Sequence, residues 1–126
     1  MNIPKETKTN NLKIGRLGEQ IAKIYLQNKG YYIIEKNYRT KYAEIDLIAR
    51  NKSVLVFVEV RARKDERFGS PEDSIKRSKI RKLIKNAQAY VARKGYVKTY
   101  RIDAICIVLE ENGRANRITH YENITF

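Results

Sequence analysis

One segment, residues 54–62, limits the folds open to this chain more than any other. Valine occupies every second position of it: Val54, Val56, Val58 and Val60. Because side chains two positions apart lie on the same side of a β-strand, Leu55 and Phe57 fall on the opposite side, and both sides are largely apolar. A strand of this kind is typical of the middle of a sheet that is covered on both sides. The segment therefore predicts a central strand.

Hydrophobic periodicity and turn residues place the other elements around this strand. Apolar residues at helical spacing predict a first helix: Ile14, Leu17, Ile21, Ile24 and Tyr25. The complete pattern predicts, in order, a helix over 12–29, strands over 31–38, 43–50 and 54–62, a helix over 71–94, and strands over 100–109 and 117–124. This is the order α-β-β-β-α-β-β.

The second helix and the last strand have boundary signals of their own. Ser70 is an N-cap residue followed by Pro71, which is favoured in the first helical turn, and Gly95 supplies a C-terminal stop. Asn112 and Gly113 form a dipeptide that predicts a hairpin turn before the last strand.

The length and the start of the chain predict one domain with a tail. A chain of 126 residues lies within the usual size of a single domain, and two domains would leave neither with a proper core. The first nine residues are polar and lack periodicity. We therefore expect residues 1–10 to form a flexible N-terminal tail, Asn10 or Asn11 to cap the first helix, and residues 11–126 to form a single domain.

The chain carries more positive charge than a fold needs. It has 27 Lys and Arg against 14 Asp and Glu, a formal net charge of +13 at pH 7. Such an excess opposes compaction by self-repulsion and predicts an acidic partner. Nucleic acid fits better than an anionic membrane surface, because the two helices have core-facing apolar arcs without the Trp and Phe belt of interfacial helices.

The compartment is predicted from the cysteine content and the hydropathy. Cys106 is the only cysteine, so it has no internal disulfide partner and no second cysteine with which to bind zinc. No stretch approaches the roughly 20 apolar residues needed to cross a bilayer, and the polar start lacks the apolar segment of a signal peptide. We expect a cytoplasmic protein with no membrane partner.

Two acids are predicted to face each other in the sheet. If the strands at 43–50 and 54–62 pair through the turn at 51–53, Ile48 lies opposite Phe57, Asp46 opposite Glu59, and Glu44 opposite Arg61. Opposed like charges are destabilising, and Glu59 occupies a costly position in a central strand.

A divalent cation between Asp46 and Glu59 would resolve this conflict. Hard ions such as Mg²⁺ or Mn²⁺ bind to one or two carboxylates together with water and phosphate oxygens. The chemistry that follows is metal-assisted hydrolysis of a phosphodiester bond. Glu19 lies at the edge of the apolar arc of the first helix, beside a stripe that permits close approach to the sheet: Gly15, Gly18, Ala22 and Leu26. It either joins the two acids or is a solvated boundary residue.

Three motifs together resemble a known family: GRLGE at residues 15–19, EIDLIA at 44–49 and VFVEVR at 56–61. The chain resembles the YraN-like family of small bacterial proteins, which is similar to Holliday-junction resolvases and to the PD-(D/E)xK nuclease superfamily. Further matching segments are FGSP at 68–71, Lys79 and RID at 101–103. The resemblance implies a restriction-endonuclease-like α/β fold, a mixed β-sheet flanked by helices, with a metal-dependent nuclease site.

The resemblance also implies roles for individual residues. Asp46 and Glu59 match the two metal-binding acids, Glu19 matches an acid of the first helix, and Arg61 occupies the position of the superfamily's lysine. Lys79 matches a lysine of the family without an assigned role. The chain departs from the superfamily pattern at two positions, with Ile45 in place of a proline and Ala43 in place of a common glycine.

Arg61 is the departure that matters most for catalysis. A lysine can orient or deprotonate the attacking water, whereas an arginine stays protonated and cannot act as a general base. Arg61 can instead hold a phosphate oxygen or stabilise the transition state. The alternative is an ion pair across the strands with Glu44.

Basic residues crowd the second helix and the loop before it: Arg61, Arg63, Lys64, Arg67, Lys76, Arg77, Lys79, Arg81, Lys82 and Lys85. Residues 76–94 contain no acid, so the cluster is typical of a surface that binds a phosphate backbone, although a solvated helix face is the alternative. Arg16, Arg63, Lys76, Lys79 and Lys82 are the expected contacts.

Three weaker signals complete the analysis. Most of the nine tyrosines are expected in the core and sheet, and none is assigned to stacking on bases. His120 lies in the last predicted strand with no identified acid or cysteine partner, so a packed or surface role is expected rather than catalysis. Asp103 lies in an apolar strand and needs a buried partner, either Arg101 or a group of the site.

The sequence thus predicts a metal-dependent endonuclease-like enzyme acting on DNA, with branched DNA among its candidate substrates. The alternatives are a non-catalytic nucleic-acid-binding module on the same fold and an RNA-associated structural protein whose acids balance local arginines. The likeness to resolvases also allows a homodimer.

Overall fold

The computed structural model describes the backbone of residues 5–125 and the side chains of residues 10–125. Its elements are α1 (Lys5–Asn28), β1 (Tyr32–Arg39), β2 (Glu44–Asn51), β3 (Val54–Arg63), the 3-10 helix η1 (Pro71–Ser74), α2 (Arg77–Lys94), β4 (Tyr100–Leu109) and β5 (Ala115–Tyr121). The α/β class and the predicted order of helices and strands are confirmed. No helix within the described residues is both long enough and apolar enough to cross a membrane.

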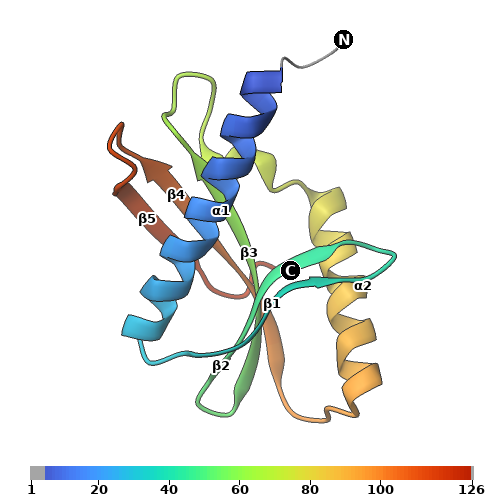
Figure 1. Cartoon of the computed structure of the whole chain (residues 1–126). Helices are drawn as coiled ribbons and strands as arrows, with labels where there is room; N and C mark the ends of the chain where they lie inside the picture. Colours follow the sequence, from blue (N-terminus) through green and yellow to red (C-terminus); the bar gives the residue numbers. More distant parts are fainter. Residues whose placement is uncertain (1–4, 126) are drawn as a thin grey trace.

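A single five-stranded sheet in the order β1-β2-β3-β4-β5 organises the molecule (Figure 1). β3 pairs with β4 in parallel, and the other neighbouring strands pair antiparallel. The chain passes from β3 to the parallel strand β4 through η1 and α2, as a parallel pair requires a long crossover. The sheet is therefore mixed and flanked by helices, as expected, and β3 is its central strand.

The two helices pack on different clusters of sheet residues. Ala22 and Leu26 of α1 belong to the cluster that contains Val56 and Val58 of β3. α2 packs on the opposite cluster, which includes the residue between those valines, Phe57. The alternation along β3 thus has the predicted result, because a strand that is apolar on both sides lies between two helical layers.

Close approach of α1 to β3 depends on the small residues of the helix. A Cβ placed on Gly18 would lie 2.6 Å from the Cβ of Ala62, closer than real Cβ atoms come. Ala22 and Leu26 continue the same buried stripe, whereas Leu17 and Ile24, expected on the apolar arc, are exposed. The centre of the helix face is therefore the small-residue stripe, and some larger apolar residues lie beyond its edges.

α1 begins at Lys5, so the predicted cap at Asn10 or Asn11 is wrong and residues 5–10 are helical. Residues 1–4 lie outside the described residues. The polar segment has no apolar periodicity because it extends past the sheet, and a helix already formed by the packed part of α1 propagates at little cost through residues such as Lys and Glu.

The second predicted helix is divided into η1 and α2. Lys76 has extended backbone angles and Ile75 lies outside the helical region, and Ser74 Oγ donates to the carbonyl of Pro71 at 2.7 Å. This local bond competes with helical hydrogen bonding, so the signals at Ser70 and Pro71 start a 3-10 turn and not α2. Gly95 ends α2 in the left-handed conformation, as predicted.

β5 spans Ala115–Tyr121, earlier in the chain than the predicted 117–124. The predicted turn at Asn112 and Gly113 is confirmed, with Gly113 at φ 84° and its N–H donating to the carbonyl of Glu110 at 2.9 Å. The turn is tight enough for pairing to resume at once with Ala115 opposite Leu109.

Candidate functional site

The residues predicted to form the site line one cleft of about 320 Å³ between α1, β2, β3 and the start of α2. Five charged side chains of the prediction line it together with Glu44 and the backbone around them: Glu19, Asp46, Glu59, Arg61 and Lys79. Four acids and two cations from four separate elements of the chain thus share one hollow.

The cleft opens where β2 and β3 stop pairing. Ile48 lies opposite Phe57, as predicted, and the ladder ends with Leu47 opposite Val58. Asp46 is not a ladder partner of Glu59; its Oδ2 instead accepts a hydrogen bond of 2.8 Å from the backbone N–H of Val60. A side-chain carboxylate takes the place of a strand acceptor here, so the two strands part and their polar residues face an open space.

Asn37 holds two of the acids together. Its Nδ2 donates to Glu19 Oε1 at 3.1 Å and to Glu44 Oε1 at 2.7 Å. Glu44 also accepts from Arg39 Nη2 at 2.8 Å. Asn37 has φ 53°, a left-handed conformation that asparagine tolerates better than most residues and that directs this part of β1 out of regular strand geometry.

The ligand oxygens of Glu19, Glu44 and Asp46 lie within 4.8 Å of one another. Carboxylate oxygens are the ligands that Mg²⁺ and Mn²⁺ prefer, so the donor set fits a hard divalent cation. Glu19 therefore joins the other acids of the cleft instead of pointing into solvent. Glu44 was not among the predicted site residues, although its position two residues before Asp46 placed it on the same side of the strand.

The electrostatics of the cleft also favour a cation. Burial, together with the neighbouring carboxylates of Glu59 and Glu19, raises the pKa of Asp46 to about 9, although the hydrogen bond from the Val60 N–H opposes this. Without an added positive charge the protonated form of Asp46 is preferred at pH 7. A divalent cation in contact with the carboxylate would favour the ionised form and offset the repulsion.

Glu59 is only 2% exposed and is paired with two cations. Its Oε2 lies 2.8 Å from Arg61 Nη2 and 3.5 Å from Lys79 Nζ. Arg61 therefore pairs with Glu59 and not with Glu44, and the predicted ion pair across the strands is wrong. The reason is the parting of β2 and β3, which ends the register that placed Glu44 opposite Arg61. Arg61 Nε is buried and has no hydrogen-bond partner among the described residues.

The other predicted basic residues lie outside this cleft. Arg63 lines a neighbouring hollow, while Arg16, Lys76 and Lys82 are exposed. None of these four side chains forms an ion pair with a described residue. Their charges are therefore not neutralised locally and remain available to an acidic partner.

Asp103 forms a second polar cluster, which does not line the carboxylate cleft. It is fully buried and accepts hydrogen bonds from Arg101 Nε at 2.9 Å and from the backbone N–H of Asn123 at 2.9 Å. His120 Nε2 lies 2.8 Å from its other oxygen. Burial opposes ionisation, but these bonds hold the pKa of Asp103 below its ordinary value.

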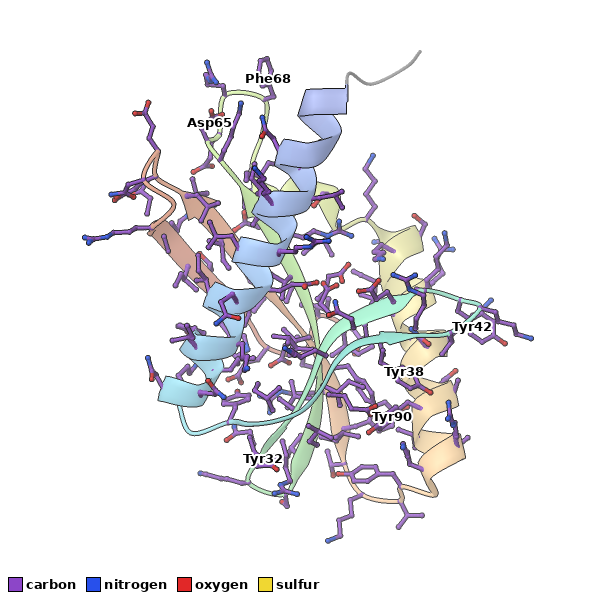
Figure 2. The ribbon with its side chains drawn as sticks, in the orientation of Figure 1. Tyr32, Tyr38, Tyr42, Asp65, Phe68 and Tyr90 are labelled. Atoms are coloured by element: carbon purple, nitrogen blue, oxygen red, sulfur yellow. The ribbon has the colours of Figure 1, made fainter. Side chains whose placement is uncertain are left out.

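This cluster answers two predictions. Arg101 is the buried partner that Asp103 was expected to need, and a contact with the site is not observed. The expectation that His120 lacks an acidic partner is wrong, because β5 returns beside β4 and brings His120 to Asp103 from 17 positions away. The side chain is packed, as predicted. Tyr31 and Tyr90 are buried and Tyr38 meets Tyr90 edge to face at 5.0 Å (Figure 2), in keeping with tyrosines in the core.

These features define a small mixed α/β domain with a carboxylate-lined cleft where two central strands part. Residues 18–107 match the model of a family described as "Uncharacterised protein family UPF0102". The chain belongs to this family, which confirms the resemblance to the YraN-like proteins.

Curated relatives of the chain extend the match over most of its length. A UPF0102 protein of Chlorobium chlorochromatii is 47% identical over 83% of this chain and 78% of its own length. Another, from Alkaliphilus metalliredigens, is 40% identical over 90% of this chain and 96% of its own length. A third, from Caldanaerobacter subterraneus, is 41% identical over 92% and 97%.

Proposed function

We propose that this protein is a divalent-metal-dependent endonuclease-like enzyme that hydrolyses phosphodiester bonds of DNA, including branched DNA. The observation that carries the proposal is the approach of the Glu19, Glu44 and Asp46 carboxylates to within 4.8 Å in one cleft. The same cleft holds Glu59 with Arg61 and Lys79. Acids that bind a cation and cations that bind a phosphate are the two groups that hydrolysis of a phosphodiester requires.

Asp46 would hold Mg²⁺ or Mn²⁺ together with Glu19 and Glu44, whose ligand oxygens lie within 4.8 Å of its own, and Glu59, which is paired with Arg61 and Lys79, would be a further donor. The bound ion would supply an acidified water and offset charge that develops on the phosphate. Arg61 stays protonated throughout and would hold a phosphate oxygen through its guanidinium. Lys79 places its amine beside the Glu59 carboxylate. This amine would bind the phosphate or orient the water.

The surface charge supports a nucleic acid as the partner. α2 contains no acidic residue, and the net charge is +13. Arg16, Arg63, Lys76 and Lys82 would contact the phosphate backbone with little sequence preference. We infer a cytoplasmic location, and a homodimer on the likeness to resolvases. Burial raises the pKa of Cys106 to about 12, so its thiol stays protonated and takes no part in this chemistry.

Cleavage of labelled DNA tests the proposal directly. Linear, nicked and four-way-junction DNA would be incubated with the protein in Mg²⁺, in Mn²⁺ and in EDTA. We expect ion-dependent cutting that is lost in Asp46→Asn and Glu59→Gln and altered in Arg61→Lys. Cutting that persists in EDTA or in both acid variants would contradict the proposal.

The second candidate is a nucleic-acid-binding module without catalysis. The Arg61–Glu59 pair favours it, because a guanidinium that occupies the lysine position cannot accept a proton from water. Binding that is equal in the wild type and in Asp46→Asn, with no cutting in either ion, would select this candidate. An RNA-associated structural role instead predicts tighter binding to RNA than to DNA, with acid variants that lose stability and not binding.

A further inference from the structure

Phe68 lies at the tip of the loop between β3 and η1 and is 88% exposed. Figure 2 shows Phe68 and Asp65 at the end of the molecule where α1 begins, opposite the end that carries Tyr32. A phenylalanine exposed to this extent gains nothing from the core, so its apolar ring is available to a partner.

Hydrogen bonds order the loop backbone on both sides of this residue. Asp65 Oδ1 accepts from the backbone N–H of Arg67 at 3.1 Å, and Asp65 Oδ2 lies 3.0 Å from the Arg67 guanidinium, which lowers the pKa of Asp65. On the other side of Phe68, Gly69 has φ 120° and donates to the carbonyl of Glu66 at 3.2 Å. The turn is thus closed by hydrogen bonds on both sides of Phe68, and the ring it carries is exposed to solvent.

Phe68 also lines a hollow that continues into the carboxylate cleft. This hollow, of about 440 Å³, lies between residues 10–15 of α1, the end of β3 and the loop. It shares Gly15 and residues 60–62 with the carboxylate cleft, so the two form one continuous depression. Arg63 and Lys64 line the same hollow, and the guanidinium of Arg67 lies 6.0 Å from the centre of the Phe68 ring.

We propose that Phe68 stacks on an unpaired nucleobase while the adjoining phosphates follow the basic hollow into the carboxylate cleft. This combination, an exposed aromatic face beside a positively charged groove, is how proteins bind single-stranded nucleic acid. Inside a duplex both faces of every base are covered by stacked neighbours, so an aromatic ring cannot stack there. The substrate class is therefore nucleic acid with an unpaired base next to the bond to be cut, such as a single-strand tail or a junction. The placement of nucleic acid over the cleft rests on the proposed function.

The chain contains no tryptophan, which makes the proposal directly measurable. The variant Phe68→Trp carries a single indole at the proposed stacking position. Its fluorescence would be followed in EDTA, where no cutting occurs, on adding a single strand, a duplex with a single-stranded tail, or a blunt duplex. We expect the single strand and the tailed duplex to quench the indole and the blunt duplex to leave it unchanged. Equal quenching by all three would overturn the proposal.

A binding series separates stacking from other contacts. Phe68→Ala and Phe68→Leu are both expected to bind the tailed duplex about tenfold more weakly than wild type, because neither has a π face. Val97→Ala is the matched control, since Val97 is 94% exposed in the loop between α2 and β4 at the opposite end of the molecule (Figure 1). Full binding by Phe68→Leu would assign the residue to a general apolar contact. If Phe68→Ala loses self-association but binds the tailed duplex as well as wild type does, Phe68 belongs to a contact between two copies of the chain. Either result overturns the proposal.

The outcome can be separated from that of the proposed function. If Phe68→Trp is quenched but the wild type cuts no DNA in Mg²⁺ or Mn²⁺, the stacking inference stands and the nuclease proposal fails. If the wild type cuts blunt and tailed DNA equally well and Phe68→Ala does the same, the nuclease proposal stands and the stacking inference fails.

Discussion

The backbone N–H of Val60 donates to Oδ2 of Asp46 at 2.8 Å, at the point where β2 and β3 stop pairing. The Asp46 carboxylate thus stabilises the fold, because it accepts the hydrogen bond that the Val60 N–H would otherwise lack. It also belongs to the candidate metal site, because it lies close to the other acids. These two roles can be separated by substitution, because an amide oxygen accepts a hydrogen bond but carries no charge.

We expect Asp46→Asn and Asp46→Ala to differ in stability and to agree in activity. Asp46→Asn keeps an acceptor for Val60, whereas Asp46→Ala leaves that N–H without one and costs about 1–3 kcal/mol. Urea denaturation in EDTA measures the difference, and cleavage in Mg²⁺ is expected to be lost in both. Equal stability of the two variants would show that the Val60 bond contributes little to the fold.

Asn37 is expected to tune cation binding without being a ligand. Asn37→Gly retains the left-handed backbone at φ 53° but removes the amide that joins Glu19 to Glu44. Loss of an outer contact of this kind typically weakens metal binding about 10- to 100-fold. The rise in melting temperature on titration with Mn²⁺ measures it, with Asp46→Asn as the variant that should show no rise. An unchanged titration in Asn37→Gly would refute the positioning role.

Two glycines of α1 should respond to alanine in opposite directions. A Cβ on Gly18 meets Ala62 at 2.6 Å, so Gly18→Ala is expected to destabilise the protein by about 1–3 kcal/mol. No atom lies within 4 Å of a Cβ on Gly15, and Gly15→Ala should stabilise by about 0.5–1 kcal/mol through helix propensity. Thermal denaturation compares them. A double variant with Ala62→Gly should recover part of the loss if the close contact is its cause.

The contact between Glu72 and Arg117 should give a pH-dependent contribution to stability. Arg117 Nη1 lies 2.7 Å from Glu72, and this side-chain hydrogen bond lowers the pKa of Glu72 from 4.5 to about 2. A lowered pKa in the folded state means that the stabilisation is present above pH 4.5 and is lost as the pH falls toward 2.

Glu72→Gln is accordingly expected to cost about 1–2 kcal/mol at pH 7 and almost nothing near the folded-state pKa. Urea denaturation across this pH range measures the difference. Glu111→Gln is the control, because Glu111 is exposed and forms no ion pair with a described residue. A difference from wild type that stays constant with pH would contradict the assignment.

Much of the fold was predictable because it depends on periodicity. The alternation at 54–62 placed β3 in the centre, and the short turn after β2 set Ile48 opposite Phe57. The same alternation of side chains along the two strands predicted that Asp46 and Glu59 lie near each other. The predicted pairing of β2 with β3 fails beyond Leu47. The two strands part there because the Val60 N–H bonds to a side chain, and no repeating pattern in the sequence indicates such a bond.

Contacts between distant segments were not predictable. Nothing near Asn37 in the sequence indicates that its amide joins Glu19 to Glu44, since the contact requires α1, β1 and β2 to be assembled. Nothing near His120 in the sequence indicates that Asp103 is its partner, and the contact forms only when β5 pairs with β4.

The sequence by itself determined the order of the elements, the central strand, the positive charge and the residue types of the site. These properties follow from side-chain chemistry and from the repeats of helix and strand, which act over a few residues. The tertiary structure decided which acids share a cleft, that Arg61 pairs with Glu59, and where Phe68 is exposed. Those outcomes depend on distances between segments far apart in the chain, which packing sets only when the domain is complete.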